Sequence, residues 1–256
     1  MKAPLSKNMK IFITGHKGLI GQDIMPLFGG HEIVGYDKKD GQELADTDCL
    51  RKTIPDKTDI VFHLANIPHP SPDILPIEYK THNRGEMICL LEVCAEKKVG
   101  GIVFFSSLAA IGFDSPVGEQ GLPFFHVCDP ELKWPDGKPP WDENTKTIPI
   151  DYDFEKYGAS KVAQEKLIKE SGIPYLILRL GPYGPMPGPE AEHTVYNDAV
   201  CKEATLSIVK KILEVGVPLK GNTIHVCREG MWGGKILKSF LEGKKVVKKE
   251  KQQKRK

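Results

Sequence analysis

Hydrophobic residues occur in two kinds of segment, which alternate along most of the chain. One kind is a short continuous run of Val, Ile, Leu and Phe, typical of a strand buried on both faces of a parallel sheet. The other is longer and has the apolar spacing of a helix. The continuous runs predict strands at 9–15, 31–37, 58–66, 100–107 and 174–181. The helical spacing predicts helices at 19–28, 86–98, 156–171 and 199–216. This alternation predicts an α/β fold with a doubly wound parallel sheet between two layers of helices.

Two segments do not follow the alternation. Residues 113–150 and 181–198 are rich in Pro and Gly, and the first also contains several aromatic residues, which argue against plain disorder. A long irregular segment inside a compact domain is usually functional. The insertion at 113–150 directly follows one predicted strand and ends shortly before a predicted helix. We therefore expect it to form a lid over a substrate or a contact between subunits.

The turn after the first predicted strand is rich in glycine. Gly15, Gly18 and Gly21 are spaced three apart in "TGHKGLIG", between that strand and a predicted helix. In a dinucleotide-binding (Rossmann) fold, the first glycine allows a tight turn, the second lets the backbone approach a pyrophosphate, and the third permits close packing of helix on sheet. The helix N-terminus adds unpaired N–H groups that favour phosphate. The turn therefore predicts a dinucleotide site.

The end of the second predicted strand carries an acidic residue, Asp37. A carboxylate at this place accepts hydrogen bonds from the adenosine ribose hydroxyls, which favours NAD over NADP. Lys38 and Lys39 follow directly and are suited to a 2′-phosphate, so NADP stays open as the less favoured alternative.

Candidate chemistry comes from "YGASK", where Tyr157 and Lys161 are four residues apart on a predicted helix and share one face. A free tyrosine has a pKa of about 10 and is no base at neutral pH. A nearby ammonium stabilises the phenolate and lowers that pKa. Upstream, Ser106 and Ser107 end a strand at the carboxyl edge of the sheet, where ligands bind in such folds.

Six short motifs occur along the chain in a fixed order. They are "TGHKGLIG", "VFHLAN", "HNRGEMICLLEVC", "FFSSLAAIG", "YGASK" and "LRLGPYGP". Over residues 9–215 the chain resembles the extended short-chain dehydrogenase/reductases, and within them the NAD-dependent epimerase/dehydratase family. The resemblance implies a triad of Ser107, Tyr157 and Lys161, with Asn83 as a supporting residue. It implies that the tyrosine takes a proton from a substrate hydroxyl while hydride moves to the nicotinamide, and that the serine orients the substrate oxygen.

The resemblance also implies the cofactor contacts. Asp46 matches an acidic residue that usually meets the adenine, and the backbone of Leu64 and Ala65 lies against the cofactor. The full set of expected NAD-binding residues is Gly15, His16, Lys17, Gly18, Leu19, Ile20, Gly21, Asp37, Asp46, Leu64, Ala65, Tyr157, Lys161 and Pro182. Family members are commonly homodimers, so a homodimer is expected.

Departures from the family pattern narrow the reaction. Leu108 and Ala109 stand where the 4,6-dehydratases carry an Asp-Glu pair, which argues against dehydration. Ile111 replaces a tyrosine that is usual in nucleotide-sugar enzymes. We expect an NAD-dependent oxidoreductase or epimerase of a sugar or nucleotide sugar. One alternative is a dehydrogenase of a free sugar acid, similar to uronate dehydrogenases, for which Arg179 and Arg228 are candidate anion partners or else structural arginines. The other is a non-catalytic dinucleotide sensor.

Charge and domain organisation add a further alternative. The net charge of the chain is +2, but residues 243–256 hold eight Lys or Arg and one Glu. Such a tail can bind nucleic acid, although a solvated terminus is the favoured interpretation. We predict a dinucleotide-binding domain at 1–180 that includes the insertion, and a small substrate-binding portion at 181–242 with a returning helix and strand. The basic tail at 243–256 follows.

Several site classes are not indicated by the sequence. The six cysteines show no C-x-x-C spacing and no partnering His cluster, so we expect free thiols and no metal. His63 lies within a predicted strand, and we expect it to be packed. No apolar run approaches the ~20 residues that span a bilayer, and "MKAPLSKNMK" does not resemble a signal peptide. We therefore expect a cytoplasmic protein that does not bind membranes.

Overall fold

The computed structural model describes residues 8–67, 76–111, 147, 156–181, 183, 198–215 and 221–226. The strands are β1 (Lys10–Thr14), β2 (Glu32–Tyr36), β3 (Ile60–His63), β4 (Ile102–Ser107), β5 (Tyr175–Leu180) and β6 (Asn222–Val226). The helices are α1 (Leu19–Ile24), α2 (Thr47–Thr53), α3 (Pro76–Glu96), α5 (Lys156–Glu170) and α6 (Asp198–Val215). Short 3₁₀ turns cover Met25–Phe28, Lys38–Asp40 and Leu108–Ile111.

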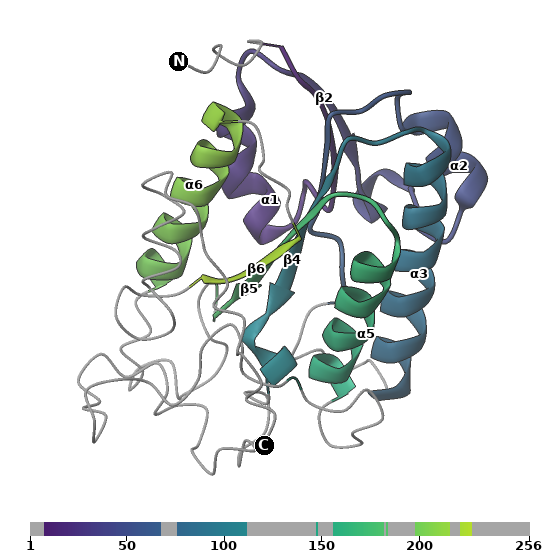
Figure 1. The fold of residues 1–256 in the computed structure, drawn as a ribbon, viewed down its shortest axis with the longest axis vertical. Helices are drawn as coiled ribbons and strands as arrows, with labels where there is room; N and C mark the ends of the chain where they lie inside the picture. Colours follow the sequence, from purple (N-terminus) through teal and green to yellow (C-terminus); the bar gives the residue numbers. More distant parts are fainter. Residues whose placement is uncertain are drawn as a thin grey trace, which may run out of the picture.

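The six strands form a parallel sheet in the order β2-β1-β3-β4-β5-β6 (Figure 1). The chain leaves β1 toward β2 on one side and returns to β3 on the other, so the direction of winding reverses between β1 and β3. Ligands bind outside the carboxyl ends of the strands at such a point. The prediction of a doubly wound α/β fold is confirmed.

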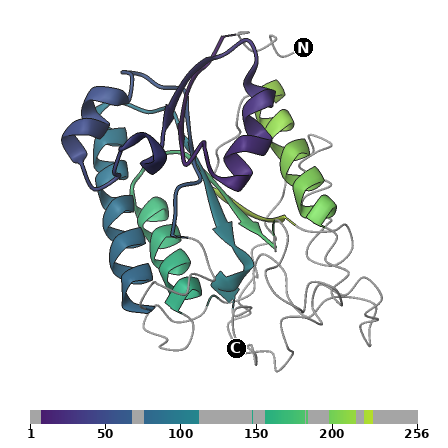
Figure 2. The same ribbon diagram turned by 180° about the vertical axis from the view of Figure 1, so that it is seen from behind.

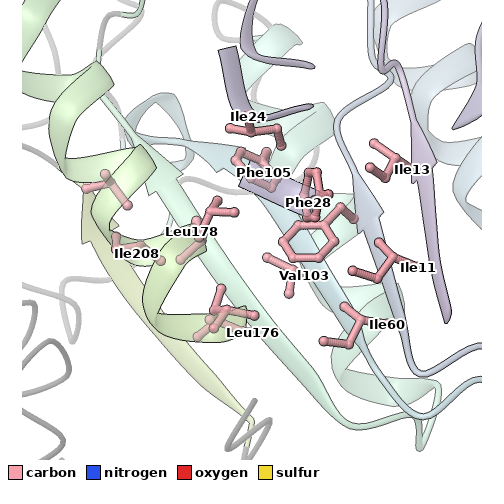
Figure 3. Packing of buried hydrophobic residues seen from close by; sticks show 14 of the residues in the cluster. Ile11, Ile13, Ile24, Phe28, Ile60, Val103, Phe105, Leu176, Leu178 and Ile208 are labelled. Carbon is pink, nitrogen blue, oxygen red and sulfur yellow. The ribbon is translucent and has the colours of Figure 1, made fainter. Parts of the chain in front are cut away.

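Helices cover both faces of the sheet. α1 and α6 lie on one face, and α2, α3 and α5 lie on the other (Figures 1 and 2). Alternate residues of a strand serve the two layers: Ile11 and Ile13 of β1 pack on the first side, and Phe12 packs on the second. Figure 3 shows the first layer, where Ile24 of α1 and Ile208 of α6 lie over the apolar side chains of the strands. Both faces are buried, which explains why the strands read as continuous apolar runs.

Helix α3 begins at Pro76, well before the predicted start at residue 86. Its first half, "IEYKTHNRG", is polar and gave no helical pattern. Tertiary packing holds it in place. Tyr79 contacts the Tyr157 ring of α5 at a centroid distance of 5.9 Å, and Asn83 is buried beside Ser160 of the same helix.

Two further differences have local causes. The helix predicted at 19–28 ends at Ile24 and continues as a 3₁₀ turn, because Pro26 has no N–H for an α-helical bond. Helix α2 was not predicted, since seven residues are too short to show a clear period. Asp46 caps its N-terminus, and its Oδ1 accepts the Cys49 N–H at 2.9 Å.

Several sequence-based expectations fall outside the described residues. Within the insertion at 113–150 the structure describes Thr147 alone, and none of the aromatic residues. The basic tail at 243–256 also lies outside the described residues. The strand predicted in the C-terminal portion is β6, which pairs with β5 in the main sheet. The domain boundary after residue 180 stays a prediction.

Candidate active site

Glycine builds the turn between β1 and α1. Gly15 has a φ of +73°, a conformation that strains other residues, and a Cβ there would lie 2.7 Å from the Ala65 backbone nitrogen. Gly18 donates its N–H to the Gly15 carbonyl at 3.0 Å. A Cβ on Gly21 would lie 2.5 Å from the carbonyl oxygens of Gly15 and His16. Gly21 therefore lets α1 approach the turn itself, whereas the sequence pattern suggested an approach to the sheet.

Asp37 joins the glycine turn to the end of β2. The residue is only 7% exposed. Its Oδ2 accepts the Lys17 backbone N–H at 2.8 Å, and its Oδ1 accepts the Lys39 backbone N–H at 2.9 Å. Two bonds fix the direction of the carboxylate. Asp37 thus lies beside the glycine turn, at the place from which the sequence predicts a contact with the adenosine ribose.

The ammonium groups of Lys17, Lys38 and Lys39 each have a partner other than the Asp37 carboxylate. The Lys17 ammonium pairs with Asp40. Lys38 pairs with Glu43 at 3.2 Å, and the Lys39 ammonium donates to the Lys17 carbonyl at 2.9 Å. A 2′-phosphate would have to compete with Asp40 and Glu43 for the first two charges.

The other side chains of the glycine turn, His16, Leu19 and Ile20, differ in what they contact. The His16 ring lies over Gly35 of β2, so closely that a Cβ on Gly35 would be 2.7 Å from it. Leu19 is 55% exposed, whereas Ile20 packs against the core. Pro182 lies outside the described residues.

The segment after β3 lies directly against the turn. The Leu64 N–H donates to the Thr14 carbonyl at 3.1 Å, and the Ala65 N–H donates to Thr14 Oγ1 at 3.3 Å. These bonds hold Leu64 and Ala65 beside Gly15, as their expected role requires. Asp46 is exposed and caps α2, and its contact with an adenine stays a prediction.

Lys161 is buried at the carboxyl end of β4. Its side chain extends from α5 and is 2% exposed. The ammonium donates to the Phe105 carbonyl at 3.2 Å and lies 5.0 Å from the centre of the Phe104 ring. It also lies 5.5 Å from the centre of the Tyr157 ring. Aromatic faces and a carbonyl oxygen each stabilise a cation, so these contacts offset part of the cost of burying the ammonium.

Ser107 is the last residue of β4 and is only partly buried. Its Oγ accepts the Ala109 N–H at 3.1 Å, which orients the hydroxyl at the start of the 3₁₀ turn that follows. Helix α5 packs on β4, so the structure brings the elements of all three predicted triad residues to one edge of the sheet. No part of this arrangement tests their catalytic roles, which stay predictions.

Asn83 connects α3 to two neighbouring segments. It is 1% exposed; its Oδ1 accepts the Ile67 N–H at 3.0 Å, and its Nδ2 donates to Ser160 Oγ at 3.2 Å. Its carbonyl oxygen accepts a bond from Gln164 at 3.2 Å. Asn83 therefore holds the segment after β3 against the turn of α5 that carries Lys161.

His63 is fully buried at the end of β3, as expected. Its Nδ1 lies 2.7 Å from Thr14 Oγ1, and its ring stacks on Phe104 with centroids 5.6 Å apart. Burial lowers the pKa of His63 to about 3, and the charge of Lys161 adds to the effect. The ring is therefore neutral at physiological pH.

A buried charged pair behind the site was missed by sequence reasoning. Glu165 of α5 binds Arg179 of β5 through both carboxylate oxygens. Arg179 is therefore a structural arginine, and Arg228 lies outside the described residues. The sequence did contain a signal, since an arginine inside the apolar strand "YLILRL" requires a buried partner.

The described ranges also bear on metal sites, disulfides and membrane spans. No group of three or more His, Cys, Asp or Glu side chains there gathers as a metal site. The cysteines described, Cys49, Cys89 and Cys94, are free thiols. None of the helices in that part of the chain is long and apolar enough to span a bilayer.

Solved structures support the fold assignment. A uronate dehydrogenase from Agrobacterium tumefaciens is 17% identical with a TM-score of 0.60, over 94% of this chain and 86% of that one. The Bordetella bronchiseptica enzyme WbmG in complex with NAD and UDP is 19% identical with a TM-score of 0.59, over 97% and 84%. A UDP-galactose 4-epimerase is 20% identical with a TM-score of 0.59, over 93% and 94%. At such identities the likeness shows the fold alone.

Sequence comparison identifies the family. No curated protein sequence matches the chain significantly. The sequence profile of the NAD dependent epimerase/dehydratase family matches residues 11–217, from β1 to the end of α6. Because this match covers most of the chain, the protein belongs to the NAD dependent epimerase/dehydratase family.

Proposed function

We propose that the protein is an NAD-dependent oxidoreductase or epimerase that acts on a sugar or nucleotide sugar through Tyr157. The observation that carries the proposal is the buried Lys161 ammonium beside the Tyr157 ring. It lies at the edge of the sheet where the glycine turn and Asp37 also lie. Family membership supports the same proposal.

The turn fits a dinucleotide. The close backbone approaches at Gly15 and Gly21 leave no room for side chains at these positions, and a diphosphate can therefore come close to the N-terminus of α1. The fixed Asp37 carboxylate suits the two hydroxyls of an adenosine ribose. We infer that Asp46 meets the adenine. NAD, when bound, supplies the hydride acceptor or donor.

The residues of the chain supply the proton chemistry. Tyr157 takes the proton of a substrate hydroxyl and returns it in the reverse direction. The Lys161 ammonium stabilises the phenolate that acts as base. Ser107, at the end of β4, binds and orients the same substrate oxygen. Asn83 keeps α5 and the segment after β3 in place.

The residues that follow Ser107 argue against one reaction of the family, and the arginines bear on the second candidate substrate. Leu108, Ala109 and Ile111 are buried and apolar, so this turn offers no acid or base for dehydration. Uronate dehydrogenases are among the similar structures, and oxidation of a free sugar acid is our second candidate. Since Arg179 is bound to Glu165, it is not available for a sugar carboxylate, and Arg228 remains the candidate.

A dinucleotide sensor of the same fold is a weaker proposal, because both Tyr157 and Lys161 are retained. The homodimer expected from the family stays a proposal. Binding of nucleic acid through residues 243–256 is not favoured. A salt-dependent shift of an oligonucleotide that is lost on deletion of this tail would support it.

NADH absorbance decides between these functions. The protein is mixed with NAD and a panel of sugar acids and nucleotide sugars, with Tyr157→Phe as the control. Net NADH formation identifies a dehydrogenase, and interconversion of isomers without net NADH identifies an epimerase. If calorimetry shows NAD binding but no compound is turned over in either direction, the sensor replaces the enzyme.

A further inference from the structure

Glu165 is a buried carboxylate to which the proposed reaction gives no role. It lies on α5, four residues after Lys161, and is 1% exposed. It accepts four hydrogen bonds. Two come from Arg179, at 2.8 Å from Nε and 2.7 Å from Nη2. The others come from Ser106 Oγ at 2.8 Å and the Lys169 ammonium at 3.2 Å.

The partners of Glu165 form a polar row across the sheet. Ser106 of β4 is the register partner of Arg179 of β5, and Arg179 is the register partner of His225 of β6. Arg179 Nη1 and His225 Nε2 are 3.4 Å apart. These three side chains are buried on the face that α5 covers. Glu165 therefore attaches α5 to a row of polar groups from three adjacent strands.

The carboxylate is charged in this setting. Burial alone raises the pKa of Glu165, but its hydrogen bonds and ion pairs, chiefly with Arg179, outweigh burial and hold the pKa below its ordinary value. A bidentate Arg–carboxylate pair constrains both position and orientation. Buried pairs of this kind add little net stability compared with apolar packing, so a role in geometry has to be considered.

The attachment lies next to the proposed catalytic groups. Tyr157, Lys161 and Glu165 are spaced four apart, which places them along one side of α5. Lys161 binds the carbonyl of Phe105, and Glu165 binds the side chain of Ser106. Successive residues of β4 thus hold successive turns of α5, directly before Ser107.

We propose that Glu165 is a positioning residue that fixes the height and rotation of α5 on β4, so that the Lys161 ammonium stays beside Tyr157. The proposal rests on the proposed function only for its effect on turnover. The alternative is a cluster that stabilises the fold and has no effect on the pair. Direct electrostatics distinguishes the two, because loss of the negative charge at Glu165 would by itself favour the Tyr157 phenolate.

The test uses Glu165→Gln in the full chain. Tyrosine labelled with ¹³C at the ring is titrated by NMR, and the Tyr157 signal is assigned with Tyr157→Phe. Displacement of Lys161 moves the Tyr157 titration to higher pH, toward its position in Lys161→Met. Once a substrate is known, Glu165→Gln should lower kcat about tenfold or more and change KM by less than about threefold.

The matched control is Glu96→Gln. Glu96 also binds an arginine through both oxygens, at 2.7 and 3.2 Å from Arg51, but at the surface and away from α5. This control should leave the Tyr157 titration unchanged. If Glu165→Gln loses thermal stability while the Tyr157 titration stays or moves to lower pH, the positioning role is refuted. The titration needs no substrate, so a failure of the proposed function leaves it intact.

If Glu165→Gln does not fold, Ser106→Ala tests whether Glu165 positions Lys161. This variant removes one of the four bonds to Glu165 and keeps the ion pair with Arg179. The positioning role requires a smaller shift of the Tyr157 titration in the same direction. An unchanged titration in a folded Ser106→Ala protein overturns it.

Discussion

The ammonium nitrogen of Lys161 lies 5.5 Å from the centre of the Tyr157 ring. This contact involves the ring face, whereas the proposed chemistry involves the phenol oxygen. The two functions of the ring can therefore be separated by a phenylalanine, which keeps the face and removes the oxygen.

Tyr157→Phe should lower kcat by about 10²-fold or more, the scale of lost general acid–base catalysis. The affinity for NAD, measured by calorimetry, should change little because the ring still packs on Tyr79 and Lys161. Turnover close to that of the unmodified protein would remove Tyr157 from the mechanism.

Asp37→Ala should weaken the binding of NAD more than that of NADP. The carboxylate is the acceptor expected for the ribose hydroxyls, and it also holds the N–H groups of Lys17 and Lys39. Calorimetry with both dinucleotides gives the two affinities. Tighter binding of NADP by the unmodified protein would show that the lysines, and not Asp37, decide the preference.

Asp40→Asn tests the lysine side of the same question. Asp40 pairs with the Lys17 ammonium and does not touch the Asp37 carboxylate oxygens. Loss of its charge should leave NAD affinity nearly unchanged and raise NADP affinity several-fold, because Lys17 then becomes available to a 2′-phosphate. Equal effects on both dinucleotides would contradict this assignment.

The positions of the first five strands along the chain and the glycine turn were predictable because each depends on local sequence. A strand buried on both faces reads as a continuous apolar run, and Gly15 has a backbone conformation that other residues rarely adopt. The first half of α3 was not predictable, since Tyr79 and Asn83 are held by contacts with residues distant in the sequence, among them Tyr157 and Ser160 of α5. The spacing of residues within α3 does not reveal its contact with α5.

The same distinction applies within the site. Tyr157 and Lys161 lie on one helix, so their spacing alone predicts that they meet. The bond between Glu165 and Arg179 joins a helix to a strand, and that between Arg179 and His225 joins two strands far apart in the chain. The packing of α5 on the sheet brings the first pair together, and the register of β5 and β6 brings the second pair together. For the insertion at 113–150, both expectations, a lid over the substrate and a contact between subunits, stay predictions.

Gly21→Ala should disrupt the glycine turn. The new methyl group would lie 2.5 Å from two backbone carbonyl oxygens, which cannot move without distorting the turn. We expect a loss of about 2–4 kcal/mol in the free energy of unfolding and at least about tenfold weaker NAD binding. Chemical denaturation and calorimetry measure the two effects.

Gly85→Ala is the matched control in α3. A Cβ there meets no atom within 4 Å beyond the neighbouring backbone of its own helix, and the position is helical. Alanine is favoured over glycine inside a helix by about 1 kcal/mol, so this variant should be slightly more stable and should bind NAD normally. A comparable loss in both variants would show that the close contacts at Gly21 are not the cause.

The buried His63 ring makes the stability of the fold depend on pH. The pKa of His63 is about 3 in the folded protein, against an ordinary value of 6.5. Between these values the unfolded chain takes up a proton that the folded protein does not. The stabilising contribution is therefore complete above pH 6.5 and is lost progressively as the pH falls toward 3.

His63→Asn removes this titration and keeps a group able to bond Thr14 Oγ1. The smaller side chain lowers stability at neutral pH, but the gap to the unmodified protein should narrow by about 2 kcal/mol between pH ~7.5 and pH ~5. Urea denaturation at a series of pH values measures this difference, in which the titration of all other groups cancels. Val61→Ala, in the same buried strand, is the control, because it shortens a side chain without removing a titratable group. Its stability deficit should be constant with pH. A constant deficit for His63→Asn as well would mean that the ring accepts a proton in the folded protein, contrary to its buried and stacked position beside Lys161.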